Sequence, residues 1–264
     1  MADGEWLLDD WQEWMALQGL SPRTIDRRTW SIGQWLAHCG DLESVEPEDL
    51  EDFLRRWPAR SSRASIQSDV RRWYVHARRR GVLIPDPTAH AEQIRVPRRV
   101  ATPVTADEVH LLIAATRPPV RTMIMLGALA GMRASEIAAV QGADVRPREA
   151  LIVVRTGKGG KSRIVPLHPM LEDELQPLPP GRYFPGVTGG AVGKRVKRAM
   201  ASWGVDARPH DLRAAFGTEA ARVSGGNMVL VQQLMGHSSV DTTQRYVRWA
   251  PDGAAVIRAL FSAA

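Results

Sequence analysis

Residues 210–246 read HDLRAAFGTEAARVSGGNMVLVQQLMGHSSVDTTQRY and carry the most informative pattern in this chain. The pattern places His210 and Arg213 three residues apart, and Tyr246 nine residues after His237, near the ends of short predicted helices. A tyrosine hydroxyl has a pKa of about 10 and is a slow nucleophile, so it needs a proton acceptor and nearby cations. The segment therefore indicates phosphate chemistry.

The length and composition of the chain narrow its domain organisation and its possible partners. The chain has 264 residues, which favours two domains, and its 35 Lys and Arg against 29 Asp and Glu give a net charge of +6. This basic balance suggests a polyanionic partner. The single cysteine, Cys39, excludes an intrachain disulfide and a multi-cysteine zinc site and fits a reducing cytosol. Because we recognise no signal peptide and no apolar run of about 18 residues, we expect a soluble protein that does not span a membrane.

The first domain, residues 1–84, is predicted to be a bundle of four short amphipathic helices. Ser21 and Pro22 supply an N-cap and a first helical position for the second helix. Pro47 begins the third, and the fourth runs over about residues 62–81. The sequence therefore predicts a wholly helical N-terminal domain.

Residues 85–103 are predicted to be an extended basic linker between domains. They contain four prolines and three arginines and show no periodic apolar face. The second domain, residues 104–264, opens with a capping box at Thr105 and Glu108. We therefore place the domain boundary in this linker.

The second domain is predicted to be mainly helical, with one β-hairpin. Strand-forming runs at 151–154 and 162–167 flank the turn TGKGG, which brings Lys158 to the hairpin tip. A helix is expected between Asn227 and Gly236, just before His237. The fold class expected for the whole chain is mainly α, with a small β-hairpin or sheet.

Four segments together resemble the tyrosine recombinases, also called the phage integrase family. They are GMRASEI at 131–137, TGKGGKSRIVPL at 156–167, HDLR at 210–213 and LMGHSSVDTTQRY at 234–246. Their order and separation also match, and the resemblance covers essentially the whole chain. It implies a four-helix SAM-like core-binding domain followed by a tyrosine-recombinase catalytic domain.

The resemblance implies a role for each matching residue. Tyr246 would attack a DNA phosphodiester and leave a 3′-phosphotyrosine and a free 5′-hydroxyl. Arg133 and Arg213 would clamp the nonbridging oxygens, because guanidinium presents a fork of donors and stays charged. Lys158 would protonate the departing 5′-oxygen.

The two histidines and one acidic residue complete the expected site. His210 would accept the tyrosine proton or hydrogen-bond to it, and His237 would donate to the phosphate. Glu136 is expected to orient active-site groups. The scheme requires no metal and no other cofactor, because side chains supply the cations.

Some residues compete with these assignments or depart from the family pattern. Lys161 is the rival of Lys158, which is favoured by its Gly-Lys-Gly setting. Tyr74 and Tyr183 are expected to be structural, since neither lies beside a basic cluster with histidines in the matching spacing. Ala214 occupies a position where the family often has a second histidine, which puts fine tuning of the site in doubt.

Arginines are also expected to contact DNA outside the active site. The fourth helix and the linker are rich in them, and the alternative is a solvated charged face. The resemblance implies that the two domains clamp duplex DNA, with mostly phosphate contacts. The candidate DNA-binding residues are Arg71, Arg72, Arg78, Arg79, Arg80, Arg95, Arg98 and Arg99.

A terminal helix after Pro251 carries an apolar stripe that includes Val256, Ile257 and Leu260. It could fold back on its own domain, or, as in relatives, dock on a neighbouring protomer of a tetramer bound to two DNA duplexes. We favour the second arrangement. Host or phage factors that bend DNA or set directionality are possible further partners.

The sequence thus predicts a site-specific DNA recombinase, most similar to a compact phage or mobile-element integrase that lacks an arm-binding domain. Two alternative enzymes use the same tyrosine-based cleavage chemistry. They are a Xer-like resolvase of chromosome or plasmid dimers and a type IB topoisomerase. A different class is a catalytically silent architectural DNA-binding protein. We expect it in the cytoplasm, at the bacterial nucleoid, or in the host cell if phage-encoded.

Overall fold

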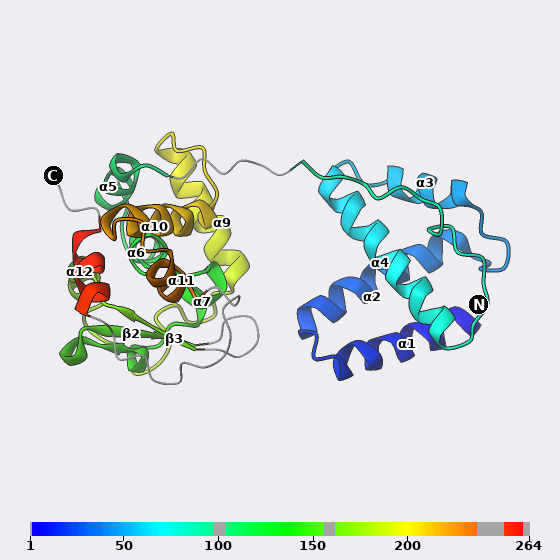
Figure 1. The fold of residues 1–264 in the computed structure, drawn as a ribbon, viewed down its shortest axis with the longest axis horizontal. Helices are drawn as coiled ribbons and strands as arrows, with labels where there is room; N and C mark the ends of the chain where they lie inside the picture. The colour runs from blue at the N-terminus through cyan, green and yellow to red at the C-terminus, as the bar shows by residue number, and fades with distance from the viewer. Residues whose placement is uncertain (1, 98–103, 156–161, 237–250, 261–264) are drawn as a thin grey trace. The chain divides into compact units, whose positions relative to one another are not determined.

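The computed structural model describes residues 2–97, 104–155, 162–236 and 251–260. The chain divides into two compact units, residues 1–99 and 100–264 (Figure 1). Each unit has its own hydrophobic core. No helix in the described ranges is long and apolar enough to cross a membrane.

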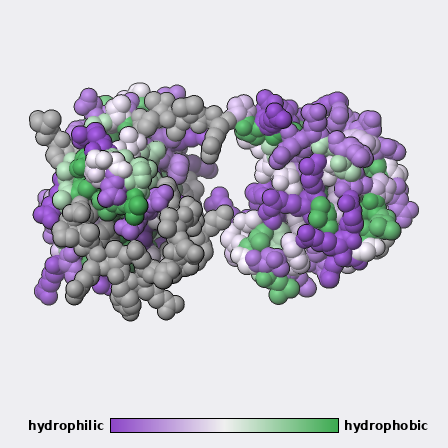
Figure 2. Space-filling view, viewed as in Figure 1, coloured by the Kyte–Doolittle hydropathy of each residue, from purple (hydrophilic) through white to green (hydrophobic). Residues whose placement is uncertain are grey.

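Unit 1 is built from four helices, as the sequence predicts. They are α1 (Ala2–Leu17), α2 (Pro22–Cys39), α3 (Pro47–Arg55) and α4 (Arg60–Arg79). Ser21 caps α2 by accepting a hydrogen bond from the Thr24 backbone N–H, and Pro22 occupies the first turn. Trp11, Trp35 and Trp73 are fully buried at the centre of the bundle. On the face shown in Figure 2, hydrophilic residues cover most of this unit.

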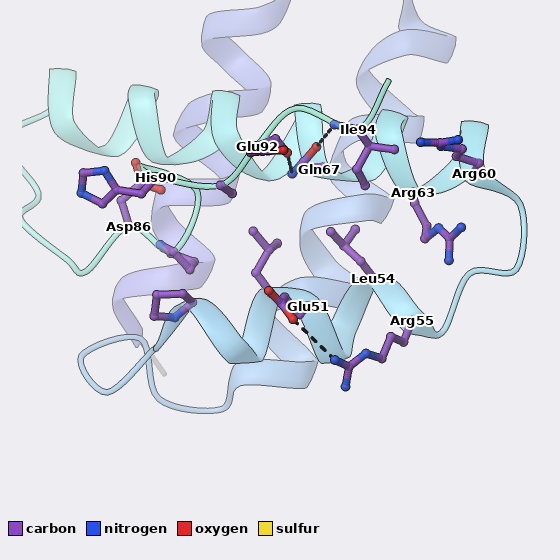
Figure 3. Close-up of a pocket in the computed structure, with 14 residues that line it drawn as sticks. Glu51, Leu54, Arg55, Arg60, Arg63, Gln67, Asp86, His90, Glu92 and Ile94 are labelled. Atoms are coloured by element: carbon purple, nitrogen blue, oxygen red, sulfur yellow. Dashed lines mark hydrogen bonds and ion pairs between the residues drawn. The ribbon is translucent and has the colours of Figure 1, made fainter. Parts of the chain in front are cut away.

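The first part of the predicted basic linker, the segment after α4, is attached to that helix by hydrogen bonds. The side chain of Gln67 donates to Glu92 O at 2.8 Å and accepts from Ile94 N–H at 3.0 Å, so it pairs with the segment as a β-strand would (Figure 3). Arg71 donates to Thr88 O and Ala91 O at 2.8 and 2.7 Å. These bonds attach the segment to α4, which is why unit 1 extends beyond residue 84.

A cavity of about 680 Å³ lies between α3, α4 and this attached segment. Figure 3 shows Leu54 and Ile94 on its wall, with Glu51, Arg55 and Arg63 nearby. Its lining is therefore mixed, with an apolar wall and both signs of charge at the rim.

Unit 2 combines helices with a three-stranded antiparallel sheet. The helices are α5 (Ala106–Ala115), α6 (Val120–Leu129), α7 (Ala134–Ala139), α8 (Pro169–Glu174), α9 (Gly189–Ser202), α10 (Pro209–Val223), α11 (Met228–Met235) and α12 (Pro251–Ala259), with 3-10 turns η1 (Gly142–Asp144) and η2 (Pro147–Glu149). The sheet order is β1 (Val145–Arg146), β2 (Leu151–Val154) and β3 (Arg163–Pro166), and Ile152 pairs with Val165. The predicted pair of strands is confirmed, and the short β1 was not predicted.

Helix boundaries in unit 2 follow local capping chemistry. Thr105 and Glu108 form the predicted capping box at the start of α5. Asn227 caps α11 by accepting from Leu230 N–H at 3.1 Å, and Gly236 ends it in the left-handed region with φ of +63°.

The apolar stripe of α12 lies on its own domain. Val256, Ile257 and Leu260 are buried in the core of unit 2, where α12 contacts α10 and β3. His168 Nε2 lies 3.2 Å from Leu260 O and anchors the end of the helix. In the single chain the stripe therefore has the fold-back arrangement, because burying it in the same domain removes its apolar surface from water. Docking of the helix on a neighbouring protomer stays a prediction.

Candidate active site

The turn before α7 directs Arg133 and Glu136 toward each other. The backbone N–H of Arg133, the N-cap of α7, donates to Glu136 Oε2 at 2.8 Å, and its guanidinium donates to Oε1 at 2.8 Å. The Arg133 side chain is 35% exposed, whereas that of Glu136 is 1% exposed. Glu136 therefore fixes one edge of the Arg133 guanidinium while part of the group still faces solvent.

A second arginine, Arg163 at the start of β3, also donates hydrogen bonds to the Glu136 carboxylate. Its NH1 and NH2 atoms donate to Oε1 and Oε2 of Glu136, both at 2.9 Å, in a bidentate pair. Its Nε donates to Leu234 O at 3.2 Å, and NH2 also donates to Gly131 O at 3.3 Å. Arg163 thus joins the sheet, the turn before α7 and the end of α11.

Arg213 lies deeper in the same cluster, on α10. It is 1% exposed, and its NH1 and NH2 atoms donate to Gly131 O and Met235 O. The last carbonyls of a helix have no intrahelical partner and attract cations, so Arg163 and Arg213 together cap the end of α11. In the described part of the chain, Nε of Arg213 is buried without a hydrogen-bond partner.

The cluster holds more positive than negative charge. Among the described groups it contains three guanidinium groups and one carboxylate. Burial, followed by the positive charges of Arg133 and Arg163, lowers the pKa of Arg213 to about 10. Burial opposes ionisation of Glu136, but the bonds from Arg163 and Arg133 outweigh it and lower its pKa. Arg213 stays charged near neutral pH, and the surplus charge suits an anion.

Gly131 supplies the carbonyl that both Arg163 and Arg213 use. Its φ is +59°, and a Cβ atom built there would lie 2.6 Å from Cδ1 of Phe216. Only glycine therefore lets the chain turn here while its carbonyl faces the two arginines.

Gly131→Ala should lower the free energy of unfolding by about 2–4 kcal/mol, because left-handed strain adds to overpacking. Urea denaturation measures this loss. Gly204→Ala is the matched control, since Gly204 has φ of +74° and a Cβ atom built there would meet no atom within 4 Å, and it should cost only about 1 kcal/mol. Equal losses in the two variants would contradict the packing argument.

The other predicted site residues divide into two groups. His210 is exposed near the start of α10, one turn before Arg213. Lys158, Lys161, His237 and Tyr246 lie outside the described residues. The structure thus brings Arg133, Glu136 and Arg213 together, and α11 ends two residues before His237.

Sequence reasoning missed Arg163, although it stands in the quoted segment TGKGGKSRIVPL. A signal was present, because alternation along a strand puts residue 163 on the same face as Val165, which is fully buried. A charged residue on the core face of a strand needs a buried partner. The missing partner was Glu136.

The competing tyrosines and the cysteine have structural surroundings. Trp35 Nε1 donates to the buried Tyr74 hydroxyl at 3.2 Å, and the Tyr183 hydroxyl donates to Leu175 O. Burial raises the pKa of Cys39 to about 12, which makes its thiolate scarce. The described residues also include no group of three or more His, Cys, Asp or Glu side chains that could hold a metal ion.

Comparison with protein families identifies the chain. The model of the phage integrase family matches residues 103–178 and 187–252, more than half of the sequence. The chain belongs to the phage integrase family. The resemblance inferred from the four segments is confirmed, and with it the assignment as a tyrosine recombinase that acts in site-specific recombination.

Individual relatives of this phage integrase family member span most of its length. Tyrosine recombinase XerA of Thermococcus kodakarensis is 28% identical, over 94% of this chain and 92% of the relative. Tyrosine recombinase XerD of Xanthomonas campestris is 31% identical, over 88% and 83%. Among solved structures, the integrase of mycobacterium phage Brujita is 27% identical, with a TM-score of 0.57 over 96% of this chain and 91% of that one.

The fold is also that of a lambda integrase fragment. A structure of this fragment as a dimer bound to a COC′ core site has a TM-score of 0.73 at 17% identity, covering 92% of this chain and 99% of that chain. This similarity confirms the mainly α fold with a small sheet. The chain is thus a member of a family of DNA strand-transferring enzymes.

Proposed function

We propose that this recombinase cuts and rejoins duplex DNA through a 3′-phosphotyrosine intermediate, and that it integrates or excises phage or mobile-element DNA. The observation that carries the proposal is the arginine cluster around Glu136, with its surplus positive charge and the unpaired Nε of Arg213. A phosphodiester is the anion that such a cluster fits best. Its charge grows during attack, so fixed cations lower the barrier.

Each predicted residue takes a role in this proposal. Tyr246 is the nucleophile, and His210 accepts its proton. Arg133 and Arg213 bind the nonbridging oxygens, the first through its exposed part and the second through its unpaired Nε. Lys158 protonates the leaving 5′-oxygen, and His237 donates to the phosphate. The intermediate conserves the energy of the broken bond, so religation requires neither ATP nor a metal.

A Xer-like resolvase is the second candidate, favoured by the similarity to XerA and XerD along most of the chain. Both candidates would assemble as a homotetramer on two duplexes. The solved lambda integrase tetramer on a Holliday junction, which shares this fold, supports such an assembly. Because α12 packs on its own domain here, its use between protomers would require its release.

The test is strand exchange between two duplexes that carry the DNA flanking the gene. We expect recombinant products, with neither ATP nor divalent metal added. Relaxation of a supercoiled plasmid without exchange would instead support a type IB topoisomerase. Binding without cleavage or exchange would support an architectural protein and contradict the proposal.

The candidate DNA-binding arginines differ in their surroundings. Arg72, Arg79 and Arg95 are exposed, and so are Arg78, which pairs with Asp86, and Arg80, which pairs with Asp10. We propose the exposed set as phosphate contacts. Arg98 and Arg99 lie outside the described residues. Arg71 differs from the exposed set, because its guanidinium donates to the carbonyls of Thr88 and Ala91 and holds the attached segment. We therefore propose a structural role for Arg71 in place of the predicted DNA contact.

Arg71→Ala should therefore lower the free energy of unfolding by about 1–3 kcal/mol, since it leaves two carbonyls without their charged donor. Arg72→Ala, at the next position of the same helix, should leave stability nearly unchanged. It should instead weaken DNA binding and reduce the slope of log affinity against log salt by about 1. Urea denaturation measures the stability of both variants, and DNA binding at several salt concentrations measures their phosphate contacts. A stable Arg71→Ala with weakened DNA binding, together with a destabilised Arg72→Ala that binds normally, would contradict these roles.

A further inference from the structure

The environment of Arg163 accounts for nearly all of its hydrogen-bonding capacity. A guanidinium has five N–H donors. In Arg163, Nε bonds to Leu234 O, NH1 bonds to Glu136, and NH2 bonds to both Glu136 and Gly131 O, which uses four of the five. The side chain is 11% exposed. Arg163 therefore has little left with which to bind a phosphate.

The groups that Arg163 contacts are the groups that orient the predicted phosphate clamp. Glu136 binds the guanidinium of Arg133, and Gly131 O binds that of Arg213. Leu234 O lies at the end of α11, next to Met235, whose carbonyl also binds Arg213. One side chain thus touches the support of both clamp arginines and the helix end that leads to His237.

The local backbone makes room for this arrangement. A Cβ atom built on Gly236 would lie 2.7 Å from Cδ of Arg163, so the glycine that ends α11 also lets the arginine side chain pass. Because β3 leads directly back to the predicted Lys158 hairpin, Arg163 joins the strand of that hairpin to the clamp.

We propose that Arg163 is a positioning residue for DNA cleavage, which holds Arg133 and Arg213 in place through Glu136 and Gly131 O without touching DNA. The inference rests on the proposed function. Misplacing reacting groups by about 1 Å can cost about 10²-fold in rate. Loss of the bidentate pair should therefore slow cleavage by about 10–100-fold while DNA affinity stays within about twofold.

The test compares Arg163→Lys with wild type in single-turnover cleavage of a nicked suicide substrate at saturating DNA. Lysine keeps the charge but cannot bridge Glu136 and both carbonyls. Arg146→Lys, on β1 of the same sheet and half exposed, is the matched control and should cleave at the wild-type rate. Thermal unfolding establishes that each variant is folded at the assay temperature, and Arg163→Gln serves if the lysine variant is not.

A double-mutant cycle with Glu136→Asp separates positioning from a merely structural role. If Arg163 acts through Glu136, the fold-losses in cleavage rate of the two single variants should not multiply in the double variant. The double variant should then cleave much faster than the product of the two single fold-losses predicts. Wild-type cleavage by Arg163→Lys, a loss of DNA affinity equal to the loss of rate, or fully independent losses would each overturn the role. A wild-type protein that forms no covalent adduct would overturn the proposed function and this role with it.

Discussion

Arg213→Lys should slow DNA cleavage by about 10²–10³-fold, the typical effect of removing a fixed donor to a reacting oxygen. Arg213 reaches Gly131 O and Met235 O and still keeps Nε unpaired in the described structure. A lysine ammonium is a single point of charge and cannot bind two carbonyls and a phosphate in one plane. Single-turnover cleavage of a suicide substrate measures the effect.

Arg222→Lys is the matched control on the same helix. Arg222 is 67% exposed and pairs with Glu219, so its replacement should leave the cleavage rate unchanged. DNA affinity of Arg213→Lys should fall far less than its cleavage rate, because most affinity comes from phosphate contacts elsewhere. A cleavage rate within a few-fold of wild type would show that Arg213 only supports the fold.

Glu136→Gln should lower the free energy of unfolding near neutral pH by about 3–5 kcal/mol, the usual cost of removing one member of a buried ion pair. Glutamine is close in shape to glutamate, so the loss is mainly electrostatic. It leaves Arg133, Arg163 and Arg213 without their carboxylate. Urea denaturation at low salt measures the loss.

The effect of Glu136→Gln should depend on pH. The bonds from Arg163 and Arg133 outweigh burial and lower the pKa of Glu136 in the folded state. A carboxylate with a lowered pKa stabilises the fold above its ordinary pKa, and this contribution is lost as pH falls through the folded value. The stability difference between wild type and variant should therefore shrink in acid. A difference that is constant from about pH 7 to about pH 3 would contradict the ionic role of Glu136.

The fold was predictable from the sequence where local chemistry determines it. Ser21, Thr105 and Asn227 start helices because their side chains accept backbone N–H groups, and each start was predicted within a residue or two. The hairpin followed from β-branched runs on both sides of a glycine-rich turn. The two-residue β1 carries too short a pattern to recognise.

Long-range contacts could not be predicted in the same way. Gln67 and Arg71 bind backbone groups 17–27 residues away, and nothing in the local sequence distinguishes them from exposed helix residues. Their contacts turned a predicted linker into part of unit 1. In the candidate active site, the motifs predicted Arg133, Glu136 and Arg213, which the structure brings together. Arg163 acquires its role only when β3 is placed beside α7 and α11.

The most direct test of the account is covalent capture on a nicked suicide substrate. The account predicts that wild type forms an adduct through a 3′-phosphate, that peptide mapping places the link at Tyr246, and that Tyr246→Phe forms none. Tyr74→Phe and Tyr183→Phe should still form the adduct, since both hydroxyls are engaged in structural hydrogen bonds. An adduct that persists in Tyr246→Phe, or one that maps to another residue, would contradict it.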